Sequence, residues 1–399
     1  AGFDFTNVWH MVEGIISPSL ISINGAGTED NPYRIHNAED FNRLIEAGSG
    51  TENAGMYYKL EADVDAYMKS LKSYEISFSG FFDGGNHSVR NISDSLFYSI
   101  LPGAEVKNII IVRDEDRMSS DESENIAHIN YGVIENCHTS EVEIEGGNGN
   151  HGGIAGDNLG GAIRGCSVTA ASVWPGDWRG DIRSGGIAGY NSGVISECVV
   201  RGGSVVCRTE TSAAGGIAGE NSDGLIENCI VWNTDLLFGM SENGGIVGRL
   251  SSGSLKNCYV NQSSVGDGSY GAVAGYVVEG SSIESCYYNL SDMQPCISAD
   301  EYKIDANCVD SKDILNLTGF DFENVWTVDA DGNIALAAVT GRGDEDDPYI
   351  VRDKYDLKNI DDGIDASGKR NYYILNNNIY SLRYDYSDSF SGSFNGQGH

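Results

Sequence analysis

Six short segments that end in cysteine recur at nearly constant spacing, and this recurrence constrains the fold more than any other feature of the chain. The segments end at Cys137, Cys166, Cys198, Cys229, Cys258 and Cys286, which lie 29, 32, 31, 29 and 28 residues apart. Three strands of about five or six residues with their turns need roughly 25–30 residues, which is one coil of a β-solenoid. The period therefore predicts an all-β, right-handed parallel β-helix with short helical insertions, because parallel crossovers are almost always right-handed.

The residues within each segment predict what fills the solenoid. In Val-Ile-Glu-Asn-Cys137 and its copies, apolar residues alternate with polar ones, so the aliphatic residue and the cysteine should both face inward. Coils stack about 4.8 Å apart, so like residues form ladders. Stacked parallel side chains point the same way, which disfavours bridging between neighbours. We therefore expect roughly seven to ten coils around a buried, reduced and apolar ladder of six cysteines.

A second motif, a glycine pair followed by an aliphatic step and another glycine, accompanies each coil. It reads Gly152-Gly-Ile-Ala-Gly-Asp-Asn158, and it returns at Gly185, at Gly215 and, with Arg249-Leu-Ser in place of the asparagine turn, at Gly244. We expect these glycines to supply turns with positive φ and to allow close approach of neighbouring coils. The matched asparagines Asn158, Asn191 and Asn221 are expected to hydrogen-bond along a ladder.

A much longer repeat frames these coils. Gly2-Phe-Asp-Phe-Thr-Asn-Val-Trp9 returns 317 residues later as Gly319-Phe-Asp-Phe-Glu-Asn-Val-Trp326. We therefore divide the chain into the closing block of a preceding unit, an opening block, the glycine-motif coils, a closing block, and the opening block of a next unit. These blocks span residues 1–23, 24–110, 111–290, 291–338 and 339–399. Residues 37–46 and their counterpart 352–360 should form short helices, followed by strands 57–60 and 372–375.

Together these motifs resemble those of GLUG-motif repeat proteins, named for the step seen here as Gly186-Ile-Ala-Gly189. The resemblance covers nearly the whole chain and includes the Gly-Phe-Asp-Phe-Glu-Asn-Val-Trp block. It departs from the usual pattern at Arg249-Leu-Ser and at Ala335-Leu-Ala. The resemblance implies an adhesin-like β-helical protein on the surface of, or secreted by, bacteria or archaea. It offers no agreed catalytic residues.

Charge and hydropathy limit the partners. The formal charge is −34, from 59 acidic and 25 basic side chains, and this excludes binding to nucleic acid. No apolar stretch approaches the ~20 residues that span a bilayer, and no signal peptide is visible. We expect an extracellular or cell-surface location, with the signal removed or outside the given sequence. The expected partners are other copies or units of the same protein, and surface glycans.

Three further cysteines lie outside the predicted ladder. Cys296 and Cys308 are 12 residues apart in an irregular acidic stretch, where a loop-closing disulfide and two free thiols are both open. Such a disulfide would contribute on the order of 2–3 kcal/mol. Cys207 has no evident partner, so both a free thiol and an intermolecular bond are open for it.

No catalytic or cofactor-binding set can be assembled from the sequence. Glu29-Asp30 and Glu345-Asp346 occupy matched places in a repeated glycine turn and are weak calcium candidates. Carboxylates elsewhere lie mostly in loops without a recurring base beside them. We expect a non-catalytic structural or adhesive element, such as a stalk, sheath, surface-layer component or adhesin. The alternatives are a polysaccharide lyase or glycoside hydrolase on a β-helix, and a carbohydrate-binding module.

Overall fold

The computed structural model describes the greater part of the chain. The described residues are 9–10, 19–20, 25–41, 54–65, 76–92, 94–113, 125–145, 149–174, 181–207, 212–238, 242–261, 264–265, 270–289, 295–300, 308–310, 317, 319–323, 325–328, 334–336, 344–346, 348–351, 370–375 and 393–395.

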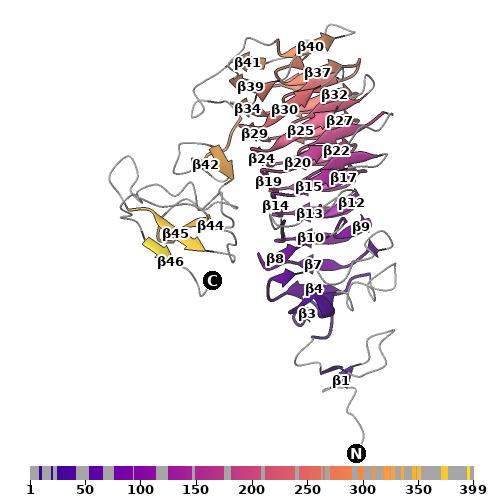
Figure 1. Cartoon of the computed structure of the whole chain (residues 1–399), viewed down its shortest axis with the longest axis vertical. Helices are drawn as coiled ribbons and strands as arrows, with labels where there is room; N and C mark the ends of the chain where they lie inside the picture. Colours follow the sequence, from indigo (N-terminus) through magenta and orange to yellow (C-terminus); the bar gives the residue numbers. More distant parts are fainter. Residues whose placement is uncertain are drawn as a thin grey trace, which may run out of the picture.

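The chain winds into a parallel β-solenoid, which confirms the predicted fold class (Figure 1). Three long sheets of 10, 10 and 9 strands run the length of the solenoid, so the coil number lies within the predicted range. One coil is a strand of the first sheet, a sharp corner, a strand of the second sheet, and a return through the third. Every pairing within these sheets is parallel, as in β13 against β18, where Ile134 lies opposite Ile163.

The strands of the first sheet, in spatial order, are β3 (Tyr33–Ile35), β4 (Tyr57–Leu60), β7 (Phe81–Asp83), β10 (Glu105–Lys107), β13 (Val133–Glu135), β18 (Ala162–Arg164), β23 (Val194–Ser196), β28 (Leu225–Glu227), β33 (Ser254–Lys256) and β38 (Ser282–Glu284).

The second sheet contains β5 (Val64–Asp65), β8 (Ser88–Arg90), β11 (Ile110–Val112), β14 (His138–Ser140), β19 (Ser167–Thr169), β24 (Val199–Arg201), β29 (Ile230–Trp232), β34 (Tyr259–Asn261), β39 (Cys286–Asn289) and β41 (Cys308–Asp310). The third contains β6 (Ser77–Phe78), β9 (Phe97–Ile100), β12 (Ala127–Asn130), β17 (Ala155–Asn158), β22 (Ala188–Asn191), β27 (Ala218–Ser222), β32 (Val247–Ser251), β37 (Ala274–Val277) and β40 (Ile297–Asp300).

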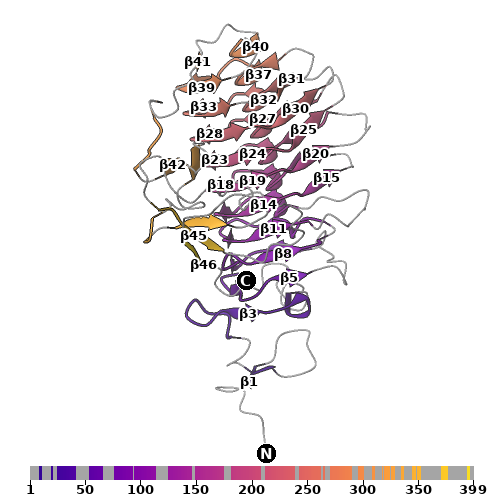
Figure 2. The same cartoon turned by 60° about the vertical axis from the view of Figure 1, so that its left-hand side comes forward.

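Between the second and third sheets, the middle coils add two further parallel sheets of five strands each (Figure 2). The fourth sheet contains β15 (Glu143–Glu145), β20 (Ser172–Trp174), β25 (Ser204–Cys207), β30 (Asp235–Phe238) and β35 (Ser264–Val265). The fifth contains β16 (Asn150–Gly152), β21 (Arg183–Gly185), β26 (Ala213–Gly215), β31 (Glu242–Gly244) and β36 (Tyr270–Gly271). In the middle coils, the segments that connect the second sheet to the third contain these strands and pair with the same segments of neighbouring coils. These connecting segments are therefore part of the solenoid wall.

The corner between the first and second sheets requires a left-handed backbone residue in each coil. Asn136, Asn228 and Asn257 have φ of 51°, 51° and 49°, which asparagine tolerates better than most residues. The glycine pairs do not serve this purpose, contrary to expectation, since none of them has positive φ. They are needed for close approach, because a Cβ on Gly185 would overlap the carbonyl oxygen of Ala188 and crowd Ala218 Cα of the next coil.

A buried ladder of asparagines joins four coils on the third sheet. Asn130 Nδ2 donates to Asn158 Oδ1 at 2.8 Å. Asn158 donates in the same way to Asn191, and Asn191 to Asn221, each at 2.7 Å. The predicted ladder is therefore present, with Asn130 as an additional member. The strand pairing continues in register beyond the last asparagine of the ladder, because Leu250 of the Arg249-Leu-Ser segment lies opposite Asn221.

A short helical segment lies near the first coil. Residues 38–41 are helical, and Asp40 N donates to the Asn37 side chain at 2.9 Å, which is the N-cap contact expected from the sequence. Phe41 is buried in the main core and its ring lies 6.1 Å from that of Phe82. Residues 42–46 of the predicted helix and its counterpart 352–360 lie outside the described residues. No helix in the described part of the chain is long and apolar enough to cross a membrane.

The later part of the closing block, from Leu317 onward, packs against the outside of the solenoid. Phe320 and Trp326 form a second apolar cluster with Ile230 and Tyr259 of the second sheet, and Trp326 is fully buried. Gly319 has φ of 96° and lies directly against the Asn257 side chain. The Gly-Phe-Asp-Phe-Glu-Asn-Val-Trp block is therefore a side brace for the coils.

The last described strands repeat the first coils. β44 (Tyr349–Val351), β45 (Tyr372–Leu375) and β46 (Ser393–Asn395) form a parallel sheet beside the solenoid (Figure 1). Tyr349 lies opposite Tyr373 just as Tyr33 lies opposite Tyr58. The strands predicted at 57–60 and 372–375 are thus both present. Two antiparallel pairs complete the described elements: β1 (Trp9–His10) with β2 (Ser19–Leu20), and β42 (Trp326–Val328) with β43 (Ile334–Leu336).

Candidate functional site

The six cysteines of the repeat lie in one column at the corner between the first and second sheets, and all are buried and free; they are Cys137, Cys166, Cys198, Cys229, Cys258 and Cys286. Their sulfurs donate weakly to backbone carbonyls. The Cys198 thiol, for example, lies 3.2 Å from the carbonyl oxygen of Ser196. Burial raises the pKa of the Cys137, Cys198 and Cys229 thiols well above the ordinary range. These thiols are therefore uncharged and poorly reactive. Their role is to pack the core of the solenoid.

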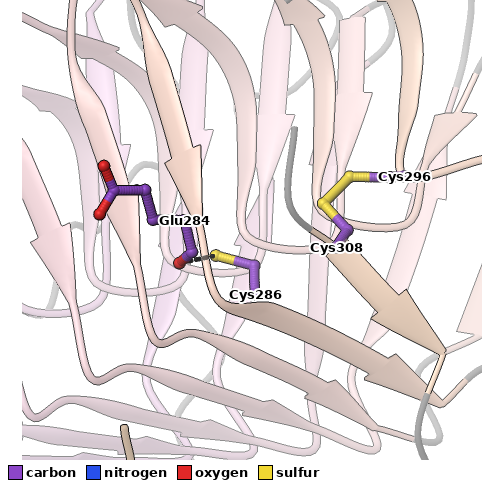
Figure 3. The surroundings of a disulfide bond; sticks show 4 residues. All are labelled: Glu284, Cys286, Cys296 and Cys308. Atoms are coloured by element: carbon purple, nitrogen blue, oxygen red, sulfur yellow. Dashed lines mark hydrogen bonds between the residues drawn. A yellow bond between two sulfur atoms is a disulfide. The ribbon is translucent and has the colours of Figure 1, made fainter. Parts of the chain in front are cut away.

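The other three cysteines have distinct surroundings. Cys296 and Cys308 form a disulfide with their Cα atoms 6.1 Å apart (Figure 3). Cys308 does not lie outside the ladder as the sequence suggested, because it pairs directly with Cys286. Cys207 is a free, buried thiol that lies 3.2 Å from the Ser184 hydroxyl oxygen. Burial raises the pKa of Cys207 to about 11. A buried thiol of this kind is poorly placed for an intermolecular bond.

A groove of about 540 Å³ crosses the first sheet at the N-terminal coils and is the candidate functional site. Its volume lies within the range of about 300–1,000 Å³ found for small-molecule sites. It is lined by Glu29, Asp30, Pro32, Arg34, Tyr57, Tyr58, Lys59, Glu61, Phe81, Phe82, Asp83, Glu105 and Lys107. These residues come from β3, β4, β7 and β10 and the turns beside them.

One side of the groove is aromatic. Tyr57 lies opposite Phe81 in the β4–β7 pairing, and their rings are stacked with centroids 4.6 Å apart and planes 19° from parallel. Both side chains are partly exposed, whereas Tyr58 and Phe82 beside them are buried. Alternation along each strand sends one aromatic residue outward and the next into the core. The outward pair and Pro32 form an apolar wall.

The other side of the groove is charged. Arg34 lies opposite Lys59, Lys59 opposite Asp83, and Asp83 opposite Lys107. Lys107 Nζ lies 3.0 Å from Glu105 Oε1, and this contact raises the pKa of Lys107. Three cationic donors and one carboxylate acceptor, Asp83, therefore share one column of the sheet, two residues from the aromatic wall.

The weak calcium candidates fall in two places. Glu29 and Asp30 line the groove, within the turn that the Thr28–Asn31 bridge closes. Glu345 and Asp346 lie in an exposed turn where Asp346 N donates to Asp344 Oδ1 at 3.1 Å. Among the residues that the structure describes, no three His, Cys, Asp or Glu side chains lie together in a way that could hold a metal ion. The structure therefore adds no third ligand to either pair.

A second polar cluster, where the third and fifth sheets meet, is internally paired. Arg183 Nε contacts Glu220, and Arg183 Nη2 lies 3.0 Å from Asp181. Arg249 Nε contacts Glu242 and also lies near Glu220. These contacts join neighbouring coils and leave the cationic groups occupied. This cluster is better explained as a brace between coils than as a ligand site.

The fold and these features define the class of protein as a parallel β-solenoid. No protein-family model matches the chain, and no curated protein matches it. Among solved structures, it is similar to one described as "a putative immunoglobulin A1 protease" from Bacteroides ovatus, with 20% sequence identity and a TM-score of 0.49. The match covers 78% of this chain and 93% of that one. A similarity at this level does not indicate a shared activity.

Proposed function

We propose that this chain is a non-catalytic structural or adhesive element of a cell surface, built as part of an elongated β-solenoid. The proposal includes membership of the GLUG-motif repeat proteins and an extracellular location, to which the Cys296–Cys308 disulfide lends weak support. The single observation that carries it is the continuity of the internal ladders. Aliphatic, thiol and amide columns pass from coil to coil.

This arrangement suits a load-bearing rod. Each coil contacts only its neighbours, so length can be added without changing the cross-section. Within the described residues, the end strands of the long sheets are each paired on one side only, and their other edge can pair with another unit or copy. The high negative charge opposes lateral clumping and favours contact at the ends.

The groove over β3, β4, β7 and β10 favours a second candidate function. Aromatic side chains beside cationic donors and a carboxylate acceptor suit a carbohydrate, either bound without turnover or cleaved. Incubation of the chain with pectin, alginate and glycosaminoglycans, with and without calcium, tests the proposal. We expect no release of unsaturated or reducing ends. Release of either product would replace the structural proposal with that of a polysaccharide-active enzyme.

A further inference from the structure

We propose that the groove on the first sheet binds a neutral oligosaccharide, with Tyr57 and Phe81 against the sugar rings and the Arg34–Lys59–Asp83–Lys107 column against their hydroxyl groups. The inference rests on the proposed adhesive function and gives it a site and a ligand class. A pyranose ring has an apolar face of C–H groups and a rim of hydroxyls. The groove offers the matching pair of surfaces, one aromatic and one charged, on the same four strands.

The charges of the groove select against acidic sugars. Five acidic and three basic side chains line it, within a chain of net charge −34. Two of the three basic groups are also paired, because Arg34 Nε lies 3.5 Å from Glu61 Oε1 and Lys107 lies against Glu105. A polyanion would meet net repulsion. Paired donors and acceptors instead suit hydroxyl groups, which both donate and accept hydrogen bonds.

The second copy of these strands shows that the fold does not need this chemistry. In the β44–β45–β46 sheet, the positions that flank the charged column keep their apolar or aromatic character, with Tyr349 opposite Tyr373 and Val351 opposite Leu375. The positions equivalent to Arg34 and Lys59 are Ile350 and Ile374. Ser393 stands where the first copy has Phe81, and Asn395 where it has Asp83. The aromatic pair and the charged column are therefore specific to the first copy and are not required for strand pairing.

The groove also has a direction. Tyr57 and Phe81 lie on neighbouring coils, as do the members of the charged column, so both walls run across the strands and along the solenoid axis. Strand spacing of about 4.8 Å repeats the same contacts at close intervals along that axis. A linear chain of several sugars lying along the axis would contact both walls at once.

The test uses isothermal titration calorimetry on the whole chain with cellohexaose, mannohexaose, xylohexaose and maltohexaose as neutral probes and hexagalacturonate as the acidic one. We expect at least one neutral probe to bind and hexagalacturonate not to bind. Phe81→Ser and Lys59→Ile each install a residue of the second copy and should weaken binding at least about ten-fold. The matched control Tyr372→Ala removes the equivalent tyrosine of the second copy and should leave binding unchanged.

The inference is wrong if no neutral probe binds, if hexagalacturonate binds more tightly than all of them, or if both variants bind as the original chain does. Thermal unfolding of each variant, followed by circular dichroism, shows that a loss of binding is not a loss of fold. Tyr57→Leu, which keeps an apolar side chain without the ring, should weaken binding if the ring is what the sugar contacts. Cleavage of a bound probe would overturn the non-catalytic proposal while leaving the site in place, so the two failures are distinguishable.

Discussion

Cys308 lies directly opposite Cys286 in the parallel pairing of β39 with β41, so a disulfide-bonded cysteine occupies the next register position of the thiol ladder. The six thiols below it are free, and Cys308 is joined to Cys296 beside β40 (Figure 3). The disulfide therefore ties the second and third sheets together at the last described coil. The same residue type packs the interior of the coils and cross-links their end.

This arrangement predicts the thiol content of the protein. Unfolded in denaturant without reductant, the chain should titrate seven thiols with Ellman's reagent, and nine after reduction. In the folded protein all seven free thiols are buried and should react slowly. Replacing Cys308 with Ala should cost about 2–3 kcal/mol of stability, felt mainly in the last coil, because the disulfide closes a short loop. Nine reactive thiols in the unreduced, unfolded chain would show that the disulfide is absent.

The asparagine ladder should be sensitive to loss of one member. Asn191 accepts from Asn158 and donates to Asn221, and all three are fully buried. Asn191→Ala removes both ladder hydrogen bonds and the acceptor of the Gly193 N–H, all in buried surroundings, so we expect a loss of about 2–4 kcal/mol. Denaturant unfolding measures this. Val194→Ala, at an exposed neighbouring position, should cost well under half as much, and equal losses for the two variants would contradict a special role for the ladder.

Glu197 should make stability depend on pH. It has φ of 55° at the corner before Cys198, where most other coils have asparagine or glycine. Burial, and then the nearby Glu227 carboxylate, raise the pKa of Glu197 above its ordinary value of 4.5. The folded state therefore holds this proton more tightly than the unfolded state does. That stabilisation is fully present below pH 4.5 and is lost as the pH rises through the folded pKa.

Glu197→Asn should therefore stabilise the protein more at pH 7 than at pH 4, while the backbone gain of asparagine at positive φ, about 0.5–1 kcal/mol, is present at both pH values. Unfolding midpoints at the two pH values measure the difference. Ser285→Asn changes the equivalent corner, with φ of 50°, without removing an acid. Its gain should be the same at both pH values. If the stabilisation by Glu197→Asn does not increase between pH 4 and pH 7, then burial and Glu227 do not destabilise the charged form of Glu197.

The brace formed by the closing block should be separable from the coils. Trp326 is fully buried against Phe320 and the second sheet. Trp326→Ala should weaken this contact by about 3–5 kcal/mol, because a large buried ring is lost. Amide hydrogen exchange should rise in residues 319–326 and stay low in the third sheet. Phe322→Ala, at a partly buried ring in the same block, should have a smaller effect; exchange that rises equally in all sheets would mean that the block is part of the main core.

The fold could be predicted from the sequence because its repeat is short and its signals are local. The spacing of the cysteines gives the length of a coil, and the alternation around Ile134 and Cys137 gives the inward face. Two features were missed. The glycine pairs predict positive φ at their own positions, whereas the corner residues with positive φ are those before the cysteines, such as Asn136 and Asn228. The register of Cys308 was missed because an irregular stretch separates it from Cys286.

The candidate site was harder to predict because its residues are spread over several coils. Arg34, Lys59, Asp83 and Lys107 lie 25, 24 and 24 residues apart, and each looks like an ordinary exposed charge on its own strand. Only stacking of the coils places them in one column beside Tyr57. The coil period could have revealed the column, because the charged residues of the opening block recur at nearly the same spacing as the coils.

The most direct test of the structural proposal is electron microscopy of the purified chain across protein and salt concentrations. Ten strands about 4.8 Å apart give a solenoid of about 43 Å, and further copies should add length at its ends. We predict elongated particles of constant width that lengthen by end-to-end association as salt or divalent cations screen the net charge. Compact particles that never associate under any of these conditions would contradict the account.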